Sequence, residues 1–293
     1  MRDMLKLTPK IGKTYVLTST IISVLVIVLV FIVLASNSWQ AITSIGWDLF
    51  SFRWNAPTGE FGILSMCFGT ALVTLIALLL AVPLGVLTAI FTSELLSSKL
   101  RIPVKSLLEL LAGIPSIIYG LIGIAFFAIW LQDFFQLQSG RTILTAGFLL
   151  ALMILPTIIT LVDDALHNIP KQYHEASLGL GLYKYEIIKN TLLPIAKADI
   201  YGAVLLAFGR ALGETMAVML VIGSIDKIPS PFFDVLSPGQ TITSKLGREI
   251  AETSFGSVHF SALIFMGLLL FSLVFIITLF AQRANKKRIR LYE

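Results

Sequence analysis

The 293-residue sequence has little of what a soluble enzyme usually needs. It has one cysteine, Cys67, so no disulfide or cysteine metal cluster can form within the chain. Its three histidines are dispersed and lack metal-site spacing, and only 13% of its residues are charged. We find no nucleophile–base set and no paired catalytic carboxylates in the apolar runs, which argues against a membrane-embedded enzyme.

The sequence also lacks an ATP site of its own. A phosphate-binding loop has the pattern G-x-x-x-x-G-K-[ST], and the G-K-T at 12–14 has Leu7 where the first glycine should stand. No other match occurs in the chain. We therefore expect no cofactor to be bound by this chain, and we expect any ATP chemistry, with its Mg²⁺, to belong to a partner.

Long apolar runs dominate instead. Hydrophobic residues make up 56% of the chain, against about 45–50% in soluble domains, and the mean hydropathy is +0.89. A membrane-spanning helix needs roughly 20 mainly apolar residues. Runs of that kind lie near 15–36, 62–91, 107–131, 142–163, 198–223 and 258–281. The first is longer than the apolar core of a signal peptide, so we interpret it as a retained helix.

These runs predict an all-α polytopic membrane protein. A single transmembrane domain should occupy 15–281, between basic tails at 1–14 and 282–293. Of the 22 Lys and Arg residues, 16 flank the helix ends predicted to share a side with both termini, and five lie in the opposite loops. The positive-inside rule then places both termini in the cytoplasm. We interpret the basic flanks as this topology signal rather than as a nucleic-acid site.

The longest predicted cytoplasmic loop runs over 163–197. Its apolar and charged residues alternate at helical spacing, which predicts two short amphipathic helices. Gly179 and Gly181 should form the turn between them. Pro194 should end the second helix before the fifth span begins. An interfacial helix pair resting on lipid headgroups would explain the composition equally well.

The spacing in this loop resembles the EAA loop of ABC importer permeases. The family's pattern is E-A-A, three residues, G, nine residues, I, one residue, L-P, and the chain follows it over 175–194. Ser177 replaces the second alanine and Thr191 replaces the isoleucine. In that family the loop forms a coupling helix that docks on the ATP-binding subunit. The resemblance implies that Glu175, Ala176 and Gly181 serve ATPase coupling.

The fifth run carries an arginine and a glutamate. Arg210 and Glu214 are four residues apart, so in a continuous helix they would share a face and pair. Arg210 lies about 18 Å into the run at 1.5 Å per residue, near the middle of the membrane, where a charge is costly and usually marks a solute path. The arginine fork would suit an oxyanion, with Glu214 holding it in place. A purely structural ion pair is the alternative.

The third run is interrupted. Gly113 and Pro115 should break or kink its helix, which is tolerated where the backbone lines a cavity or is buried in protein. A half-helix restarting at Pro115 would aim free N–H groups near Ser116 at an anion. Ser116 and Tyr119 would add hydroxyl groups. A simple packing kink explains the same residues.

Three stretches together resemble the permeases of the phosphate-specific transport (Pst) family. They are A-V-P-L-G-V-L-T-A-I-F-T-S-E at 81–94, A-G-I-P-S-I-I-Y-G at 112–120 and R-A-L-G-E-T-M-A-V at 210–218. The G-E-T-M-A-V ending is like that of the C-type subunits. The resemblance implies a six-helix permease of the MetI-like ABC importer type. Its partners would be an A-type sister permease, an ATP-binding subunit dimer and an extracytoplasmic phosphate-binding protein.

Other functions stay open on the sequence alone. A permease for another oxyanion, such as sulfate or molybdate, would need the same arginine, and a passive channel would need no docking loop. The stretch at 242–252 has Ile242, Leu246 and Ile250 at every fourth position. We expect it to pack on the outer interface rather than to seat a binding protein.

Overall fold

The computed structural model describes residues 4–289, and the side chains of residues 12–97 and 99–279. This part of the chain is almost entirely helical, with one two-stranded antiparallel hairpin. The helices are α1 (Met4–Ile45), α2 (Leu64–Ile90), α3 (Ser98–Ala112), α4 (Ser116–Ile122), α5 (Ala128–Phe135), α6 (Ile143–His167), α7 (Lys171–Gly179), α8 (Lys184–Ile187), α9 (Leu193–Gly213), α10 (Met216–Val221), α11 (Ile242–Glu249) and α12 (Val258–Ile289). The strands are β1 (Trp54–Asn55) and β2 (Glu60–Phe61).

Six segments of the described chain are long and apolar enough to span a membrane, as predicted. They are Gly12–Phe50, Leu64–Leu95, Ser116–Phe135, Ile143–His167, Lys184–Gly213 and Val258–Leu279. Several combine more than one element, because short π-helical turns continue the helix across a boundary. The polytopic all-α class is therefore confirmed.

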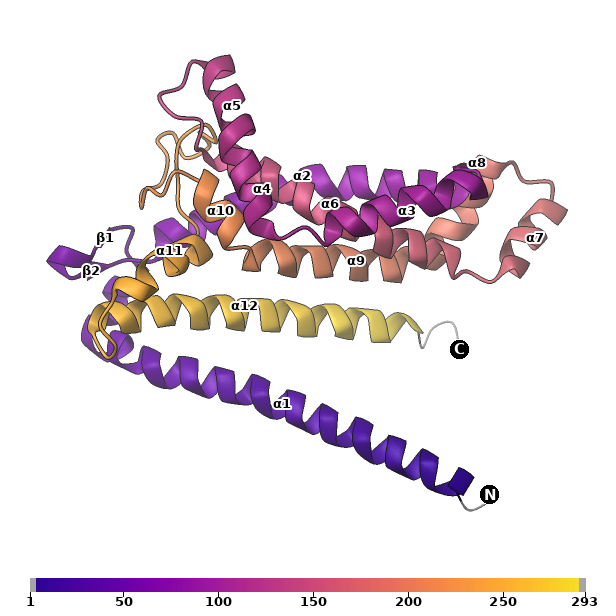
Figure 1. Ribbon diagram of the computed structural model, residues 1–293, viewed down its shortest axis with the longest axis horizontal. Helices are drawn as coiled ribbons and strands as arrows, with labels where there is room; N and C mark the ends of the chain where they lie inside the picture. Colours follow the sequence, from indigo (N-terminus) through magenta and orange to yellow (C-terminus); the bar gives the residue numbers. More distant parts are fainter. Residues whose placement is uncertain (1–3, 290–293) are drawn as a thin grey trace.

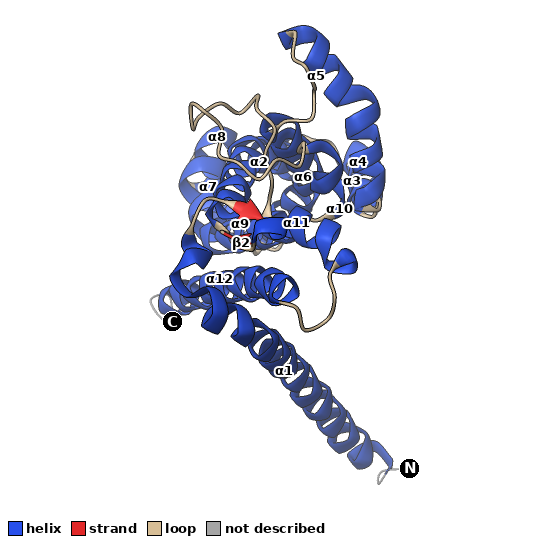
Figure 2. Ribbon diagram, turned by 90° about the vertical axis from the view of Figure 1, so that its left-hand side faces the viewer, coloured by secondary structure: helices blue, strands red, loops and turns tan. Residues whose placement is uncertain are grey.

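The spans lie roughly along the long axis of the molecule, except for Ser116–Phe135, whose helices α4 and α5 project away from it (Figure 1). Helices α2, α3, α6 and α9 pack together, α12 lies beside α9, and α1 packs on α12. We call the end that carries β1, β2 and α11 the hairpin end, and the end that carries α7 and α8 the loop end. Figure 2, which views the molecule from the hairpin end, shows α5 and α1 projecting on opposite sides of the bundle.

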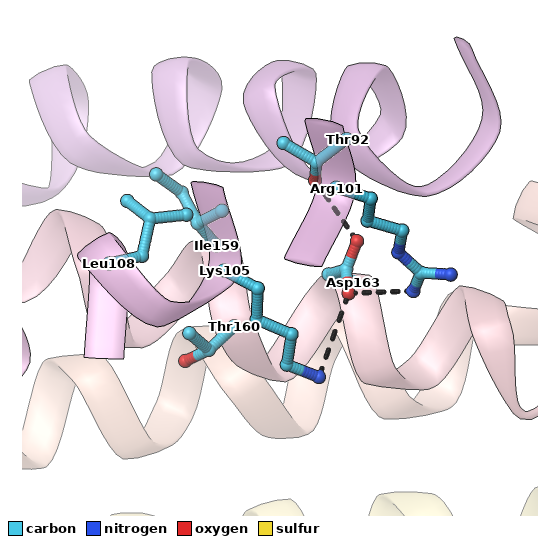
Figure 3. Close-up of a pocket in the computed structure, with 7 residues that line it drawn as sticks. All are labelled: Thr92, Arg101, Lys105, Leu108, Ile159, Thr160 and Asp163. Atoms are coloured by element: carbon cyan, nitrogen blue, oxygen red, sulfur yellow. Dashed lines mark hydrogen bonds and ion pairs between the residues drawn. The ribbon is translucent and has the colours of Figure 1, made fainter. Parts of the chain in front are cut away.

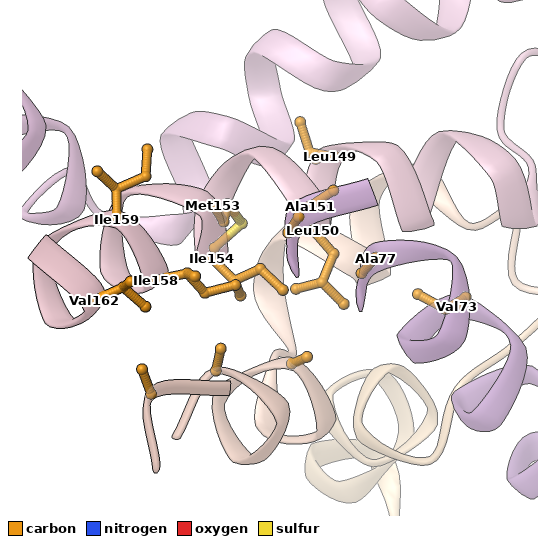
Figure 4. Close-up of a cluster of buried hydrophobic side chains, with 14 of the residues drawn as sticks. Val73, Ala77, Leu149, Leu150, Ala151, Met153, Ile154, Ile158, Ile159 and Val162 are labelled. Atoms are coloured by element: carbon orange, nitrogen blue, oxygen red, sulfur yellow. The ribbon is translucent and has the colours of Figure 1, made fainter. Parts of the chain in front are cut away.

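Helix α6 is the centre of the core. Its buried side chains, among them Leu150, Ile154 and Ile158, pack between α2 and α9 (Figure 4). The two neighbours meet it with stripes of small residues at four-residue spacing, Ala77 and Ala81 on α2 and Ala203, Ala207 and Ala211 on α9. Small residues let membrane helices approach closely, where van der Waals packing replaces the hydrophobic effect.

Three predicted boundaries were wrong. The third span begins at Ser116 rather than at 107, because the chain breaks at 113–115 and α3 is a separate helix. The fifth span ends at Gly213 rather than at 223. Pro194 does not end a helix: it follows the π-helical turn Ile188–Leu192 as the second residue of α9, and the helix continues through this turn from Lys184 to Gly213.

The first and last helices extend into the stretches predicted as basic tails. Helix α1 already begins at Met4, and α12 continues to Ile289, so most of 1–14 and 282–293 is helical. Residues 1–3 and 290–293 lie outside the described part. Helix α6 extends to His167, so the connection between the fourth and fifth spans covers 168–183 rather than 163–197.

Candidate functional site: two helix breaks and a coupling loop

The first helix break separates α3 from α4. Helix α3 ends at Ala112, the chain turns through residues 113–115, and α4 restarts with Pro115 as its N-cap. No side chain caps α4, and Pro115 has no N–H, so the first N–H groups of the helix are not satisfied by a cap. The Tyr119 hydroxyl donates a hydrogen bond of 2.9 Å to the Leu111 carbonyl oxygen and ties the two helices across the break. The predicted break at Gly113–Pro115 is confirmed.

The second helix break separates α9 from α10. The backbone leaves the helix at Glu214, which is extended (φ −68°, ψ 127°). Glu214 therefore does not share a helical face with Arg210, and no ion pair joins the two among the described residues. The Glu214 carboxylate instead accepts a hydrogen bond of 3.2 Å from the Ala217 N–H, inside the first turn of α10. The predicted Arg210–Glu214 pair is wrong, because it assumed a continuous helix.

Arg210 points to α6 instead. Its guanidinium donates a hydrogen bond of 2.7 Å to the Thr157 hydroxyl, near the middle of the 25-residue α6. Arg210 lies within electrostatic range of Tyr119 on α4. Among the described residues it has no carboxylate within ion-pair distance. A guanidinium with one neutral partner keeps donors and charge available for an anion.

The two breaks lie next to each other, because α4 packs on α10. Gly120 permits this approach: a Cβ there would lie 3.0 Å from the Ala217 Cα and 2.7 Å from the Leu220 side chain. The helix-break site consists of Ser116 and Tyr119 of α4, Thr157 of α6, Arg210 of α9, and Glu214 in the break after α9. The structure thus brings Arg210 to Thr157 and near Tyr119, with Ser116 and Glu214 at the starts of the packed helices α4 and α10. Nothing in the sequence around Thr157 distinguishes it from the neighbouring threonines.

The loop end carries the predicted coupling residues. Helix α7 holds Glu175 and Ala176, both exposed, and the chain turns at Gly181 with φ +75°, a left-handed conformation that glycine adopts without strain. The turn prediction at Gly181 is confirmed. Leu180 and Tyr183 beside it expose 80% and 79% of their surface. Exposed apolar side chains on a polar loop are typical of an interaction surface.

The two positions that depart from the EAA pattern contact each other. Ser177 is buried, and its hydroxyl lies 3.1 Å from the Thr191 hydroxyl. The Ser177 hydroxyl also donates a hydrogen bond of 2.8 Å to the Tyr173 carbonyl oxygen. Thr191 belongs to the π-helical turn that leads into α9. The hydrogen bond therefore fixes α7 directly on the fifth span, so both departures together serve the packing of the loop.

A buried ion cluster, missed in the sequence, lies near the C-terminal end of α6 (Figure 3). The Asp163 carboxylate is only 4% exposed, and it accepts hydrogen bonds from Arg101 at 2.9 Å and Thr92 at 3.0 Å. The Lys105 Nζ lies 3.8 Å from the same carboxylate and donates a hydrogen bond to Asp164. The hydrogen bond to Asp164 raises the pKa of Lys105. The cluster joins α2, α3 and α6. Its signal was an acidic pair at the end of the fourth apolar run, together with basic residues just before the third apolar run.

The stretch at 242–252 packs against α2 and α12. Ile242 is buried, and Leu246 and Ile250 join a cluster with α2 and α12. Lys245 is buried too, paired with Asp226 at 2.5 Å and Glu249 at 2.6 Å. Burial alone would raise the pKa of Glu249, but hydrogen bonds from Lys245 and His259 outweigh it and hold that pKa below its ordinary value.

Comparison with known proteins agrees with this arrangement. The profile of the family described as "Binding-protein-dependent transport system inner membrane component" matches residues 81–291. A phosphate transport system permease protein PstC from Mesorhizobium japonicum is 38% identical over 288 residues, covering 90% of this chain and 87% of the relative. A probable ABC transporter permease protein, YqgH, from Bacillus subtilis is 34% identical, and the match covers 82% of this chain and 77% of the relative. The PstC protein of Haemophilus influenzae is 33% identical and covers 87% and 86%.

Solved structures share the fold. An inward-facing structure of the MetNI methionine ABC transporter has a TM-score of 0.57 at 18% identity, covering 80% of this chain and 99% of that chain. A bacterial ABC transporter involved in alginate import has a TM-score of 0.56 at 16% identity, covering 96% and 99%. The six apolar spans and the match over 81–291 together define a multi-pass inner membrane protein. The chain therefore belongs to the family of binding-protein-dependent transport system inner membrane components.

Proposed function

We infer that this chain is the transmembrane permease subunit of an ATP-driven importer of inorganic phosphate, a transport subunit rather than an enzyme. The relatives named as phosphate permeases cover most of the chain at 33–38% identity. The observation that carries the proposal is Arg210, which lies beside two helix breaks and has no carboxylate partner among the described residues. Its guanidinium fork fits phosphate oxygens bidentately.

The helix-break site supplies the rest of an anion path. Thr157 orients the Arg210 guanidinium through its hydroxyl. Ser116, at the uncapped start of α4, offers a backbone N–H and a hydroxyl to an anion. Tyr119 lies on the same helix and holds the break in place. Glu214 is a positioning residue, because its carboxylate begins α10 and turns the chain away from Arg210.

The rest of the importer is supplied by partners. We propose an orientation with the loop end and both termini in the cytoplasm, which rests on the 16 basic residues predicted for that side. A sister permease of the A type would complete the path, and an extracytoplasmic phosphate-binding protein would deliver the anion. A dimer of ATP-binding subunits, with their ATP and Mg²⁺, would dock at Glu175, Ala176 and Gly181, next to the exposed Leu180 and Tyr183.

The geometry favours a direct mechanical connection between docking and transport. The fifth span is one helix from Lys184 to Gly213, about 45 Å long at 1.5 Å per residue. The Ser177–Thr191 hydrogen bond fixes α7 near one end of it, and Arg210 lies near the other. A movement of α7 between two ATPase states would therefore move Arg210 relative to Thr157. ATP binding and hydrolysis would alternate access by favouring different positions of α7.

The test is uptake of radioactive phosphate into proteoliposomes that contain this chain with its partner subunits. We expect uptake that requires ATP and the binding protein, and that excess sulfate or molybdate does not compete away. Competition by sulfate or molybdate would assign the site to another oxyanion. Equilibration of phosphate without ATP would indicate a passive channel.

The coupling loop has its own test in the same preparation. Glu175→Trp places a bulky side chain on the exposed face of α7 and should abolish ATP-dependent uptake, while the complex stays in the membrane. The matched control is Lys189→Trp, an exposed position outside α7 on the π-helical turn. Wild-type uptake by the Glu175 variant would refute the docking assignment.

A further inference from the structure

A second pocket lies at the hairpin end, beside α10. Its volume is about 430 Å³, within the range of roughly 300–1,000 Å³ common for small-molecule sites. Met219 and Leu220 of α10 form part of its wall, and Ser224 follows directly after that helix. Arg141, just before α6, and Arg248, in α11, complete the polar part of the lining. Two arginines from distant parts of the sequence thus line one cavity.

The charges of these two arginines are not neutralised by the described residues. Neither forms an ion pair there, and Arg248 makes one long hydrogen bond of 3.5 Å to the Ser224 carbonyl oxygen. Lys245, on the same helix as Arg248, is held by two carboxylates. The carboxylates of Asp226 and Glu249 therefore pair with Lys245 and not with the arginines that line the pocket.

The charge distribution makes this grouping informative. Only five of the 22 Lys and Arg residues are predicted for the hairpin-end side, and two of those five line this one pocket. Arg141 and Arg248 are both exposed and line the same pocket, and an anion bound there would relieve the repulsion between their like charges. Cationic clefts also raise the local concentration of anions.

The pocket is adjacent to the helix-break site. Helix α10 has six residues, about 9 Å at 1.5 Å per residue, and contributes Met219 and Leu220 to the pocket. Its other end begins at Glu214 and Thr215, four residues after Arg210. An anion in the pocket is thus separated from Arg210 by the length of this short helix.

We propose that Arg141, Arg248 and the Ser224 hydroxyl form a phosphoryl-oxyanion site at the hairpin-end mouth of the path, from which the anion passes along α10 to Arg210. This rests on the proposed function as a phosphate permease. The guanidinium forks match phosphoryl oxygens, and the turn at Gly223 and Ser224, with φ +91° and +62°, brings Ser224 to the wall. The phosphoryl group is that of free phosphate or of a lipid headgroup.

Arginine modification tests the site directly. The complete complex, in nanodiscs of neutral lipid, is treated with phenylglyoxal, and the modified peptides are quantified by mass spectrometry. At matched ionic strength, millimolar phosphate should slow modification of Arg141 and Arg248 at least fivefold relative to chloride. Arg53, an exposed arginine on the same side that does not line the pocket, should be unaffected.

The lipid composition distinguishes the two sources of phosphoryl group. Protection by free phosphate assigns the site to the transported anion. Protection that appears only in phosphatidylglycerol nanodiscs assigns the same chemistry to a headgroup and refutes the passage of the anion from the pocket to Arg210. Equal modification in chloride, phosphate and phosphatidylglycerol overturns the proposal.

Transport separates this inference from the proposed function. Arg141→Gln with Arg248→Gln should lower phosphate uptake about tenfold at saturating binding protein, whereas Arg53→Gln should stay within twofold of wild type. A wild-type complex that imports no phosphate refutes the proposed function. Normal uptake by the double variant, together with unprotected arginines, refutes only the pocket. If the double variant does not assemble, protection in the wild-type complex decides.

Discussion

Asp163 and Arg210 are both charged residues within the helical bundle, and their surroundings are opposite. The Asp163 carboxylate is 4% exposed and lies against two cations and a threonine hydroxyl. Arg210 has the Thr157 hydroxyl and no carboxylate within ion-pair distance among the described residues. The first charge is neutralised by the chain itself, and the second is not.

The difference separates structural from functional charge. A buried charge is tolerated when partners compensate for its lost hydration, and removing one partner leaves the other uncompensated. Asp163 meets that condition within the chain and joins α2, α3 and α6 at the loop end. Arg210 does not meet it among the described residues, and we assign its compensation to a ligand. The predictions below test this division.

The largest effect is expected at Arg210. Arg210→Gln removes the charge and the fork, and phosphate uptake should fall about 100-fold, the equivalent of roughly 3 kcal/mol of charge-assisted hydrogen bonding. Arg210→Lys keeps the charge but not the guanidinium fork, and phosphate uptake should fall about tenfold. The yield of assembled complex should match wild type in both. A Gln variant that assembles poorly would place Arg210 with Asp163 as a structural residue.

Asp163 should give the reverse pattern. Asp163→Ala leaves Arg101 and Lys105 without their buried partner and should lower the free energy of unfolding by about 3 kcal/mol. Its neighbour Asp164 is half-exposed, so Asp164→Ala should cost under about 1 kcal/mol. Denaturant unfolding in detergent measures both, and phosphate selectivity of any assembled Asp163 variant should be unchanged. An equal loss of unfolding free energy in Asp163→Ala and Asp164→Ala would contradict the interpretation that Asp163 is a structural charge neutralised within the chain.

Thr157 tests whether Arg210 is positioned by α6. Thr157→Val removes the hydroxyl that accepts from the guanidinium and should lower uptake about fivefold, equivalent to roughly 1 kcal/mol. Thr160→Val is the matched control, because the Thr160 hydroxyl bonds only to carbonyl oxygens of its own helix. Rates that fall equally in both variants would assign the effect to helix packing.

The smallest effect concerns the neutralised cluster around Lys245. The pKa of Glu249 is held below its ordinary value of 4.5 by Lys245 and His259. A carboxyl with a lowered folded-state pKa stabilises the fold above its unfolded pKa, and this stabilisation is lost as the pH falls through the folded one. The free energy of unfolding of the wild type should therefore exceed that of Glu249→Gln by under about 1 kcal/mol at pH 5–7. This difference should disappear as the pH falls below the ordinary pKa of the carboxyl. An advantage that grew on acidification would contradict the assignment.

The sequence predicted those features that follow from local rules. Apolar run length yielded the six spans, Pro115 and Gly113 indicated the first break, and Gly181 indicated the coupling turn. The second break at Glu214 was missed because Gly213 stands inside an apolar run and the capping role of the glutamate depends on α10. Pro194 was misread because its position in the first turn of α9 is not visible in the sequence.

Long-range partners could not be predicted from one sequence. Asp163 meets Arg101 across 62 positions and Thr92 across 71, and Arg210 meets Thr157 across 53. Several threonines and basic residues would have been equally acceptable partners by spacing. The packing of α6 between α2, α3 and α9 selects the actual pairs.

The most direct test of the account is a density map of the complete complex, with its partner subunits, saturated with phosphate. We predict a tetrahedral anion within about 3 Å of the Arg210 guanidinium, between the breaks at 113–115 and 214–215, while Asp163 keeps its partners. A carboxylate of another subunit paired with Arg210, with no anion there, would contradict the central claim.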